Sequence, residues 1–514
     1  MTPPSEKLAG SLDALRSLEE RGIVAVRARD LSRSHRERLV RHGFLLPVMK
    51  GWYVAGAPDR RAGDSTAWYA SFWRFCAGYL RARFGEAWCL SPEQSLLLHA
   101  GNRTVQAQLL VRAPRGRNRV TPLLHDTSLL EVRAAMPTTG DIVEVGGMRA
   151  FRPAAALIAC PARFFRRHAV DARAALALVG DASDLLPRLL AGGHGTVAGR
   201  LAAAFRDVGR DAIANEVVET MRAADFGVRE SNPFATAPPA RPIRRDVAPV
   251  VRRLHLIRDA MRGRVLDRFP RPPVRPAEVE VVVARIEDIY VTDAYHSLSI
   301  EGYHVSPTLI ARVRSGDWNP ERHAADRAHR DALAARGYWQ AHQAVRNSVR
   351  RAVAGAPPGA VAEADHRTWY RELFAPSVAA GLVRPADLAG YRDAPVFIQR
   401  SMHVPPSPSA VRDAMPALFE LLREEPDPAV RAVLGHFLFV YVHPYPDGNG
   451  RIGRFLMNLM LTAAGYPWTV IPVERRDAYM AALEAASVRH DIGPFTDFLA
   501  ELVGEGAELG DDAA

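Results

Sequence analysis

The chain has 514 residues, of which 48% are hydrophobic, and it carries a formal net charge of +10. This composition is far from that of a disordered chain, and the length suffices for about three domains. Three cysteines occur without a CxxC pair or a neighbouring His cluster, which excludes a disulfide scaffold and disfavours a zinc site. We find no signal peptide and no apolar run of about 18 residues, so we expect a cytoplasmic protein that does not enter a membrane.

Residues 1–56 predict a small basic domain. Residues 5–21, 28–31 and 32–43 are expected to be helices, followed by a hairpin that turns at Lys50-Gly51. Between residues 21 and 50 the chain has eight Arg or Lys residues and two acids. This outline is typical of a winged helix-turn-helix that binds DNA through residues 21–54. The alternative is an ordinary helical domain with a solvated basic face.

A separate α+β domain is expected over residues 57–230. Ser91-Pro92-Glu93-Gln94 has the residue types of a helix N-terminus with a capping box. Alternating apolar residues predict strands over 107–113, 129–134 and 142–151, and Ala-rich helices follow. No catalytic pattern appears in this domain. Together with residues 1–56, it resembles the AbiEi-type antitoxin-like regulators, through motifs of low specificity.

The rest of the chain is predicted to be a proline-rich linker and a helical domain. Five prolines over residues 231–249 indicate a semi-stiff linker, and residues 250–505 are strongly helical in pattern. The acidic residues of 506–514 indicate a solvated tail. The predicted fold class is mainly α, with an all-helical core and a β-hairpin at 395–404, preceded by the winged helix-turn-helix and the α+β domain. The helices expected in the core cover 277–302, 322–350, 365–376, 409–424 and 429–442.

The segment HPYPDGNGRIGR, residues 443–454, carries the predicted chemistry. Its Gly-Asn-Gly at 448–450 lets the chain turn sharply into a helix, whose first N–H groups and dipole form an anion nest. Arg451 and Arg454 lie three residues apart and present two guanidinium groups to one anion. This charge exceeds what one carboxylate needs, so the segment predicts a polyphosphate site.

Asp447 and His443 complete the predicted site. A carboxylate beside such cations suits Mg²⁺ that bridges phosphate oxygens, and the imidazole can accept a proton at neutral pH. Each feature alone has a structural explanation, because a His often caps a helix, DGNG is a common turn and paired arginines are common on surfaces. Within twelve residues, their combination predicts transfer of a phosphorus-centred group to a hydroxyl.

This segment resembles the Fic family motif H-x-F-x-D/E-G-N-G-R-x-x-R, with Tyr445 in place of the usual Phe. The resemblance covers roughly residues 250–505, and it implies transfer of AMP from ATP to a Ser, Thr or Tyr hydroxyl of a protein. The kinase-like Doc branch has Ala and Lys at the two loop glycines, so two glycines here favour AMP transfer. The residues implied are His443 as base, Asp447 as Mg²⁺ ligand, and Gly448, Asn449, Gly450, Arg451 and Arg454 around the phosphates.

Two more site features follow from the resemblance alone. Residues 395–404 correspond to the family's flap, which registers the target by main-chain pairing as an added strand, and Ile398 and Gln399 in this segment are expected to bind the cofactor. Tyr479 stands where family members place an aromatic residue against adenine. Ser487 stands where relatives often have Asn.

The segment SLSIEG, residues 297–302, suggests a built-in inhibitor. Glu301 is expected in the last turn of a helix, where the dipole disfavours a negative charge unless a cation or solvent compensates. Ser297, Glu301 and Gly302 match the family's inhibitory motif S/T-x-x-x-E-G/N. The match implies that Glu301 pairs with Arg454 and removes the ligand of the terminal phosphate. In some relatives the same glutamate supports removal of AMP, and that second activity stays open.

Two functions are thus in competition. The first is an ATP- and Mg²⁺-dependent AMP transferase fused to a DNA-binding regulator, in the manner of a toxin joined to its antitoxin. The second is a transcriptional regulator whose Fic core senses nucleotide, although sensing needs no base at position 443. The expected partners are a protein with a hydroxyl side chain and DNA, and a homodimer is left open.

Overall fold

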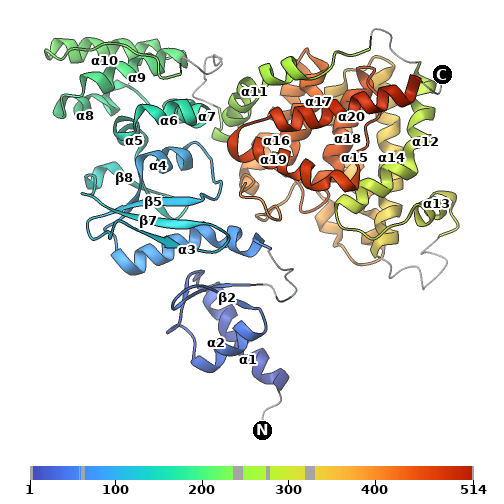
Figure 1. The fold of residues 1–514 in the computed structure, drawn as a ribbon, viewed down its shortest axis with the longest axis horizontal. Coiled ribbons are helices and arrows are strands. Elements are labelled where there is room, and N and C mark those ends of the chain that lie inside the picture. Colours follow the sequence, from blue (N-terminus) through green and yellow to red (C-terminus); the bar gives the residue numbers. More distant parts are fainter. Residues whose placement is uncertain are drawn as a thin grey trace. The chain divides into compact units, whose positions relative to one another are not determined.

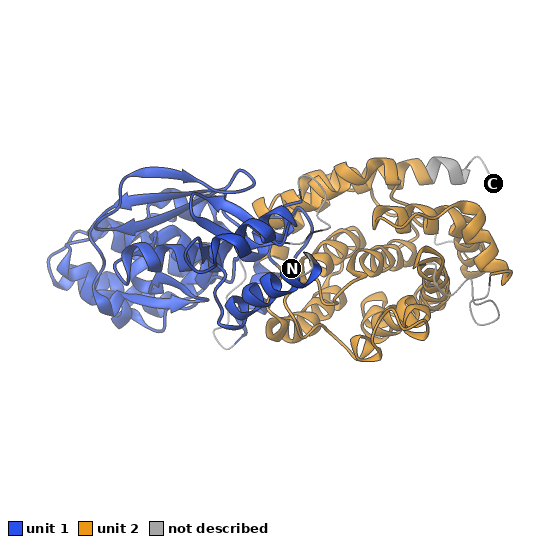
Figure 2. Ribbon diagram, turned by 90° about the horizontal axis from the view of Figure 1, so that it is seen from below, with its two compact units in different colours: residues 1–256, 397–404 blue, residues 257–396, 405–514 orange. Residues whose placement is uncertain are grey.

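The computed structural model describes residues 4–56, 58, 64–234, 247–273, 278–318 and 330–511. By contacts the chain forms two compact units, residues 1–256 with 397–404 (unit 1) and residues 257–396 with 405–514 (unit 2), coloured separately in Figure 2. Most of the expected linker at 231–249 lies outside the described residues, as do residues 322–329 of one expected helix and the chain end at 512–514. The unit boundary falls inside helix α11, Pro249–Arg268. Among the described residues, no helix is both long and apolar enough to cross a bilayer.

The first elements of unit 1 are two helices and a three-stranded sheet (Figure 1). Ser32 caps the second helix by accepting the His35 N–H at 3.2 Å. The helix expected at 28–31 is wrong, because the Asp30 carboxylate accepts the Arg27 N–H at 2.7 Å and closes a local turn instead. The elements are α1 Pro4–Glu20, β1 Val26–Arg27, α2 Arg33–Arg41, β2 Leu45–Met49 and β3 Trp52–Ala55, with strand order β1-β3-β2.

A four-stranded mixed sheet and a hairpin follow, and all three expected strand regions are confirmed. Strands β4 and β6 were not expected, because β4 has only two residues and β6 is largely exposed without alternation. The elements are α3 Thr66–Phe84, β4 Cys89–Leu90, α4 Pro92–His99, β5 Gln108–Ala113, β6 Arg119–Pro122, β7 Ser128–Arg133, β8 Ile142–Val145 and β9 Met148–Phe151. The sheet order is β4-β5-β7-β6, with β5 parallel to β7.

Gln94 departs from its expected role in a capping box. Ser91 caps α4 as predicted, accepting the Gln94 N–H at 3.2 Å. The Gln94 side chain bonds to β5 instead, donating to Gln108 O at 3.0 Å and accepting the Leu110 N–H at 3.2 Å. It therefore fastens the helix to the sheet.

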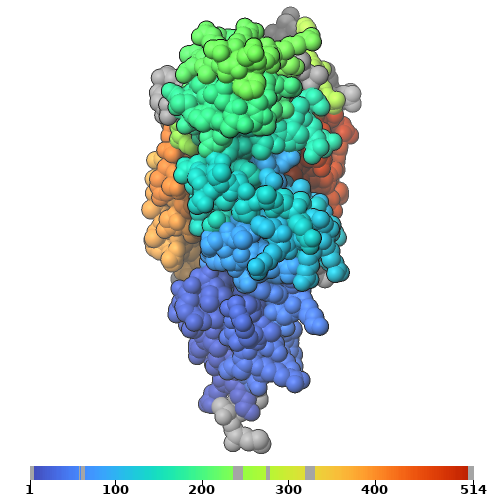
Figure 3. All heavy atoms as spheres, turned by 90° about the vertical axis from the view of Figure 1, so that its left-hand side faces the viewer, coloured from blue at the N-terminus to red at the C-terminus, as the bar shows by residue number. Residues whose placement is uncertain are grey.

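The hairpin of residues 45–55 shares a hydrophobic core with the α+β elements that follow it. Trp52 packs edge-on against Tyr79 of α3, with ring centroids 5.2 Å apart, and Val54 is buried in the same cluster. Residues 1–56 also form a hydrophobic cluster of their own, and the expected division at residue 56 stays a prediction. Figure 3 shows a face of unit 1 from its N-terminal residues in dark blue to the helices in green. Those helices are α5 Pro153–Ala159, α6 Ala162–Arg167, α7 Ala169–Leu176, α8 Leu186–Ala191, α9 Gly195–Asp207 and α10 Asp211–Ala223.

Unit 2 is a helical body built around one central helix. Helices α12, α14, α15 and α17 all contact α18, which explains why almost every residue of α18 is buried (Figure 1). The all-helical core is thus confirmed. Its helices are α12 Val279–Ile300, α13 Pro307–Ser315, α14 Arg330–Val353, α15 Pro358–Ala379, α16 Pro408–Glu424, α17 Pro428–Val442, α18 Asn449–Ala463, α19 Arg476–Arg489 and α20 Gly493–Asp511, joined to α11.

The flap segment, residues 395–404, forms a turn but not the expected β-hairpin. Ser401 N–H donates to Ile398 O at 3.1 Å, yet no strand ladder forms across the turn. Pro395 and Pro405 flank the turn and lack the N–H groups that a ladder requires. Residues 397–404 group with unit 1, where Met402 O accepts the Val105 N–H at 2.8 Å.

Helices α14 and α15 touch through Gly337, which yields a stability prediction. A Cβ at this position would lie 2.0 Å from the backbone oxygen of Leu373. We expect Gly337→Ala to lower the free energy of unfolding by about 1–3 kcal/mol, measured by denaturant unfolding. The control is Gly263→Ala in α11, where a Cβ meets nothing and stability should rise by up to about 1 kcal/mol. Equal stability of the two variants would contradict this packing.

Candidate active site

The segment 443–448 is a tight turn between α17 and α18. His443 ends α17 in the left-handed region at φ +53°, and Gly448 precedes α18 at φ +79°. Asn449 closes the turn, because its side-chain amide donates to Tyr445 O at 2.8 Å and accepts the Tyr445 N–H at 2.9 Å. The Tyr445 ring stacks on Tyr370 at 3.8 Å between centroids, so it serves the packing role expected of the usual Phe. Asn449 is therefore a clamp of the turn.

The two glycines of the turn make room for different neighbours. A Cβ at Gly448 would lie 2.8 Å from the Phe374 ring, and one at Gly450 would lie 2.3 Å from Glu301 Oε1. From the sequence, only the backbone of these glycines was expected to matter, as a cradle for phosphate. The structure adds that Gly450 is what allows the Glu301 carboxylate to approach α18.

The His443 imidazole is oriented by its own helix. Its Nδ1 lies 3.1 Å from Val440 O, and because a carbonyl can only accept, Nδ1 carries the proton. In the neutral ring Nε2 is therefore the free basic nitrogen. Burial lowers the pKa of His443 to about 4, against the opposing effect of the Val440 hydrogen bond, so the ring is neutral at pH 7.

Arg454 is held on the side of α18 that faces α12. Its Nε donates to Ser297 Oγ at 2.9 Å, and its Nη2 donates to Ser297 O at 3.0 Å and to Glu301 Oε1 at 2.8 Å. Burial alone would lower the pKa of Arg454, but the Glu301 carboxylate more than reverses this and raises it. The structure thus contains the expected contact of Glu301 with Arg454, and it adds Ser297 as a second partner of the guanidinium.

Glu301 ends α12 through the predicted left-handed Gly302. Tyr303 N–H donates to Leu298 O at 3.1 Å, which completes a Schellman motif. Burial would raise the pKa of the Glu301 carboxyl, but Arg454 and Arg451 lower it below its usual range, so it is charged at pH 7. About a quarter of its side chain, 25%, is exposed.

Arg451 is held by other neighbours than Arg454, although the Glu301 carboxylate is influenced by both cations. Its side chain is only 1% exposed and lies between the rings of Tyr303 and Phe374, at 5.2 Å and 5.1 Å from their centroids. Its Nη2 lies 3.5 Å from Asp447 Oδ2. These cation–π contacts hold the guanidinium beside the turn.

Two of the buried guanidinium nitrogens that have no hydrogen-bond partner in the described part of the chain belong to the arginines of this turn and helix. Arg451 Nε and Arg454 Nη1 have no hydrogen-bond partner within the described residues. An unpaired buried donor costs about 1–3 kcal/mol, so both nitrogens fit a site that takes an anionic ligand such as a nucleotide phosphate.

The donor set near the turn suits Mg²⁺ only in part. Asp447 has 62% of its side chain exposed, and its Oδ1 accepts the Gly448 N–H at 2.6 Å. Among the described residues no group of three or more His, Cys, Asp or Glu could enclose a metal. One exposed carboxylate fits a Mg²⁺ ion held jointly by protein and phosphate oxygens, which is the usual arrangement for this ion.

The remaining expected site residues are less clearly placed. Tyr479 is 1% exposed, and its hydroxyl lies 2.7 Å from His436 Nε2, in a core with Phe495. A ring that stacks on adenine needs a free face, so this placement does not favour the expected contact. Ile398 and Gln399 lie in the flap segment, and their role stays a prediction.

Several residues near the site were not anticipated. Asp293 is buried on α12 and accepts the Tyr338 hydroxyl at 2.6 Å. With Ser297 and Glu301 it forms a polar row at a spacing of four, which interrupts the apolar face of α12 and is visible in the sequence. Arg392, which donates from Nε to His443 O at 2.8 Å, gave no such signal.

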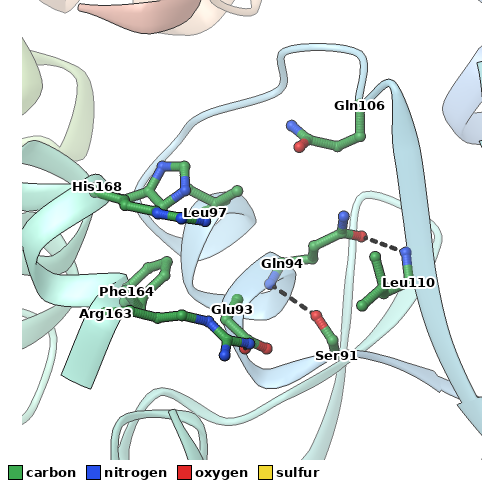
Figure 4. Close-up of a pocket in the computed structure, with 10 residues that line it drawn as sticks. Ser91, Glu93, Gln94, Leu97, Gln106, Leu110, Arg163, Phe164 and His168 are labelled. Carbon is green, nitrogen blue, oxygen red and sulfur yellow. Dashed lines mark hydrogen bonds and ion pairs between the residues drawn. The ribbon is translucent and has the colours of Figure 1, made fainter. Parts of the chain in front are cut away.

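Unit 1 contains a cavity of about 190 Å³ that is separate from these residues (Figure 4). It lies at the N-terminus of α4, and the dashed lines in Figure 4 mark the bonds that hold Gln94. None of the expected site residues lines it. Its polar lining includes Glu93, Arg163 and His168.

The turn thus brings together a proton acceptor, a helix N-terminus and unpaired buried guanidinium donors on a helical core. Residues 361–461 match the Fic/DOC family model. The chain is 40% identical over 124 residues to "Protein adenylyltransferase Fic" of Nematostella vectensis, covering 23% of this chain and 28% of that protein. It is 34% identical over 125 residues to "Protein adenylyltransferase fic-1" of Caenorhabditis elegans, covering 24% of each.

The chain spans about a quarter of the length of these curated relatives. Among solved structures, Fic-1 (residues 134–508) from C. elegans is similar with a TM-score of 0.37 and 19% identity, over 69% of this chain and 98% of that one. A likeness of this degree does not extend the family match beyond residues 361–461.

The state of the His443 ring yields a pH prediction. Because its pKa is lowered to about 4, the imidazole should still be neutral at pH 5.5, where an ordinary histidine near 6.5 is mostly protonated. Nitrogen-15 NMR of the imidazole measures this, with His443→Ala to assign the signals. The unfolded chain takes up this proton first as pH falls, so His443 contributes stability above about pH 6.5 that is lost towards pH 4. A midpoint at or above 6.5 would contradict the burial of the ring.

Proposed function

We propose that the protein transfers AMP from ATP to a hydroxyl side chain of a target protein. The observation that carries this proposal is the turn of residues 443–454, where a neutral imidazole stands beside unpaired guanidinium donors and a helix N-terminus. The names of the curated relatives, which match over the Fic domain, support the same activity.

In this mechanism each group has a distinct task. Nε2 of His443 takes the proton of the attacking hydroxyl, whose oxygen bonds to the α-phosphorus of ATP. The bond from that phosphorus to the bridging oxygen breaks, and pyrophosphate leaves. The backbone N–H groups at the start of α18 bind phosphate oxygens.

Charge on the phosphates is met by two arginines of α18 and by a cation beside Asp447. The guanidinium groups of Arg451 and Arg454 offer their unpaired donors to phosphate oxygens. Asp447 would hold a Mg²⁺ ion, which neutralises phosphate charge when it is bound. Through these contacts the chain orients the triphosphate towards His443.

We further propose that Glu301 inhibits this reaction from within the chain. Its carboxylate engages Arg454 at 2.8 Å and occupies the space beside Gly450, at the start of the helix whose N–H groups would bind phosphate. A carboxylate there competes with the terminal phosphate of ATP for the same cation. The inhibitory role rests on this competition.

Replacing Glu301 tests both the transfer and its inhibition. Loss of a charge-assisted hydrogen bond worth about 1.5–3 kcal/mol should raise labelling of protein by α-labelled ATP about ten- to a hundredfold in Glu301→Gly. His443→Ala in that background should lower it by about 10²–10⁴, since the general base is lost. The exposed His304→Ala is the control and should leave labelling unchanged. Equal labelling with and without His443 would end the proposal.

DNA binding by the N-terminal elements is a second proposed function. Its support is the order helix, strand, helix and hairpin, with Arg33 and Arg41 on the exposed side of α2 and Lys50 at the hairpin tip. Arg36 and Arg38 are used internally, donating to Ala28 O and Lys7 O. Fewer basic side chains are therefore available to contact DNA than the sequence suggested.

The full chain can be tested on a fluorescent DNA duplex. Contacts to phosphates predict that affinity falls steeply between low and high salt, and that changing Arg33, Arg41 and Lys50 to Ala removes most of the salt dependence. Fluorescence anisotropy provides the affinity at each salt concentration. Absence of binding at low salt would exclude DNA as a partner of this segment.

A further inference from the structure

Arg392 is a buried cation whose bonds all go to backbone carbonyls. It is 2% exposed, and no carboxylate among the described residues forms an ion pair with it. Its Nε donates to His443 O at 2.8 Å, its Nη1 to Ala394 O at 3.1 Å and its Nη2 to Pro406 O. Burial lowers the pKa of its guanidinium to about 10. Burying a charge lowers the stability of the fold unless well-placed hydrogen bonds compensate for the lost hydration.

One of these bonds fixes the backbone of His443, the proposed base. His443 stands at φ +53°, a conformation that non-glycine residues seldom adopt. Besides the bond from Arg392 Nε to His443 O, the Arg392 backbone N–H donates to Pro444 O at 2.9 Å. The His443 ring is held from the other side by Val440 O. Two consecutive carbonyls of the turn are therefore set by a single residue outside it.

The other two bonds hold the ends of the flap segment. Ala394 immediately precedes residues 395–404, and Pro406 follows them closely. Because one rigid guanidinium binds both carbonyls, it fixes the separation of the two ends as well as their distance from the turn at His443.

We propose that Arg392 is a positioning residue that sets the backbone of the proposed base, His443, relative to Ala394 and Pro406. This inference rests on the proposed function and deepens it. The planar guanidinium donates hydrogen bonds in three directions. A lysine at this position could replace at most part of these three bonds. The backbone of His443 would then hold its imidazole in one orientation towards the acceptor hydroxyl.

Arg392→Lys and Arg392→Met, each in the Glu301→Gly background, test the proposal. Arg431→Lys is the matched control, since Arg431 also lies on the Fic core and bonds to a backbone carbonyl, Pro426 O at 3.4 Å, but at the other end of α17. Hydrogen–deuterium exchange followed by mass spectrometry measures how well the backbone N–H groups of these segments are protected. Peptides over 391–396 and 439–448 should exchange about tenfold faster in both Arg392 variants, and unchanged in the control.

Kinetics separate positioning from a general loss of structure. Incorporation of α-labelled AMP into protein should show kcat lower by about ten- to a hundredfold, with KM for ATP within about twofold, because the nucleotide contacts on α18 remain. Lys should retain more activity than Met. A rise in KM for ATP that matches the fall in kcat, or unchanged exchange at the turn, would overturn the positioning role. If the parent protein itself incorporates no label, the proposed function fails, while the exchange data still decide whether Arg392 holds the turn and the flap ends.

Discussion

The ion pair between Arg454 and Glu301 is the interaction on which the site depends. It links α18, whose N-terminus follows the catalytic turn, to the C-terminal end of α12 at 2.8 Å. Ser297 adds two more acceptors to the same guanidinium, and Gly450 provides the space for the carboxylate. Because Nε and Nη2 of Arg454 are already hydrogen-bonded, the guanidinium can bind a phosphate only through Nη1 or after it separates from Glu301. In the proposed mechanism, Glu301 and the terminal phosphate therefore compete for this cation.

Helix ends supply most of the polar groups around the ion pair of Arg454 and Glu301. The C-terminus of α17 supplies His443, the N-terminus of α18 supplies free N–H groups, and the C-terminus of α12 supplies Glu301. The negative end of the α12 dipole is compensated by Arg476, whose Nε donates to Ile300 O at 2.8 Å. Glu301 can thus remain charged at a position that a helix dipole disfavours. Three packed helices convert unsatisfied backbone groups into a site for an anion.

Much of the core and of the site could be predicted from sequence, because local patterns encode it. The expected helices of unit 2 follow from apolar periodicity, whereas α13, α19 and α20 were not predicted, and the turn at 443–454 follows from its glycines. The side-chain placements of Arg451 and Gln94 could not be predicted, because both depend on residues far along the chain, Tyr303 and Leu110. The flap failed as a hairpin since flanking prolines withhold donors, and Arg392 was missed because its partners are backbone carbonyls without a sequence signature.

The most direct test of the account is a crystal structure of the Glu301→Gly variant with ATP and Mg²⁺. The account predicts that the terminal phosphate lies against the Arg454 guanidinium and the first N–H groups of α18, with Nε2 of His443 facing the α-phosphorus. Arg454 still bound to Ser297 alone, with the triphosphate located elsewhere, would contradict it.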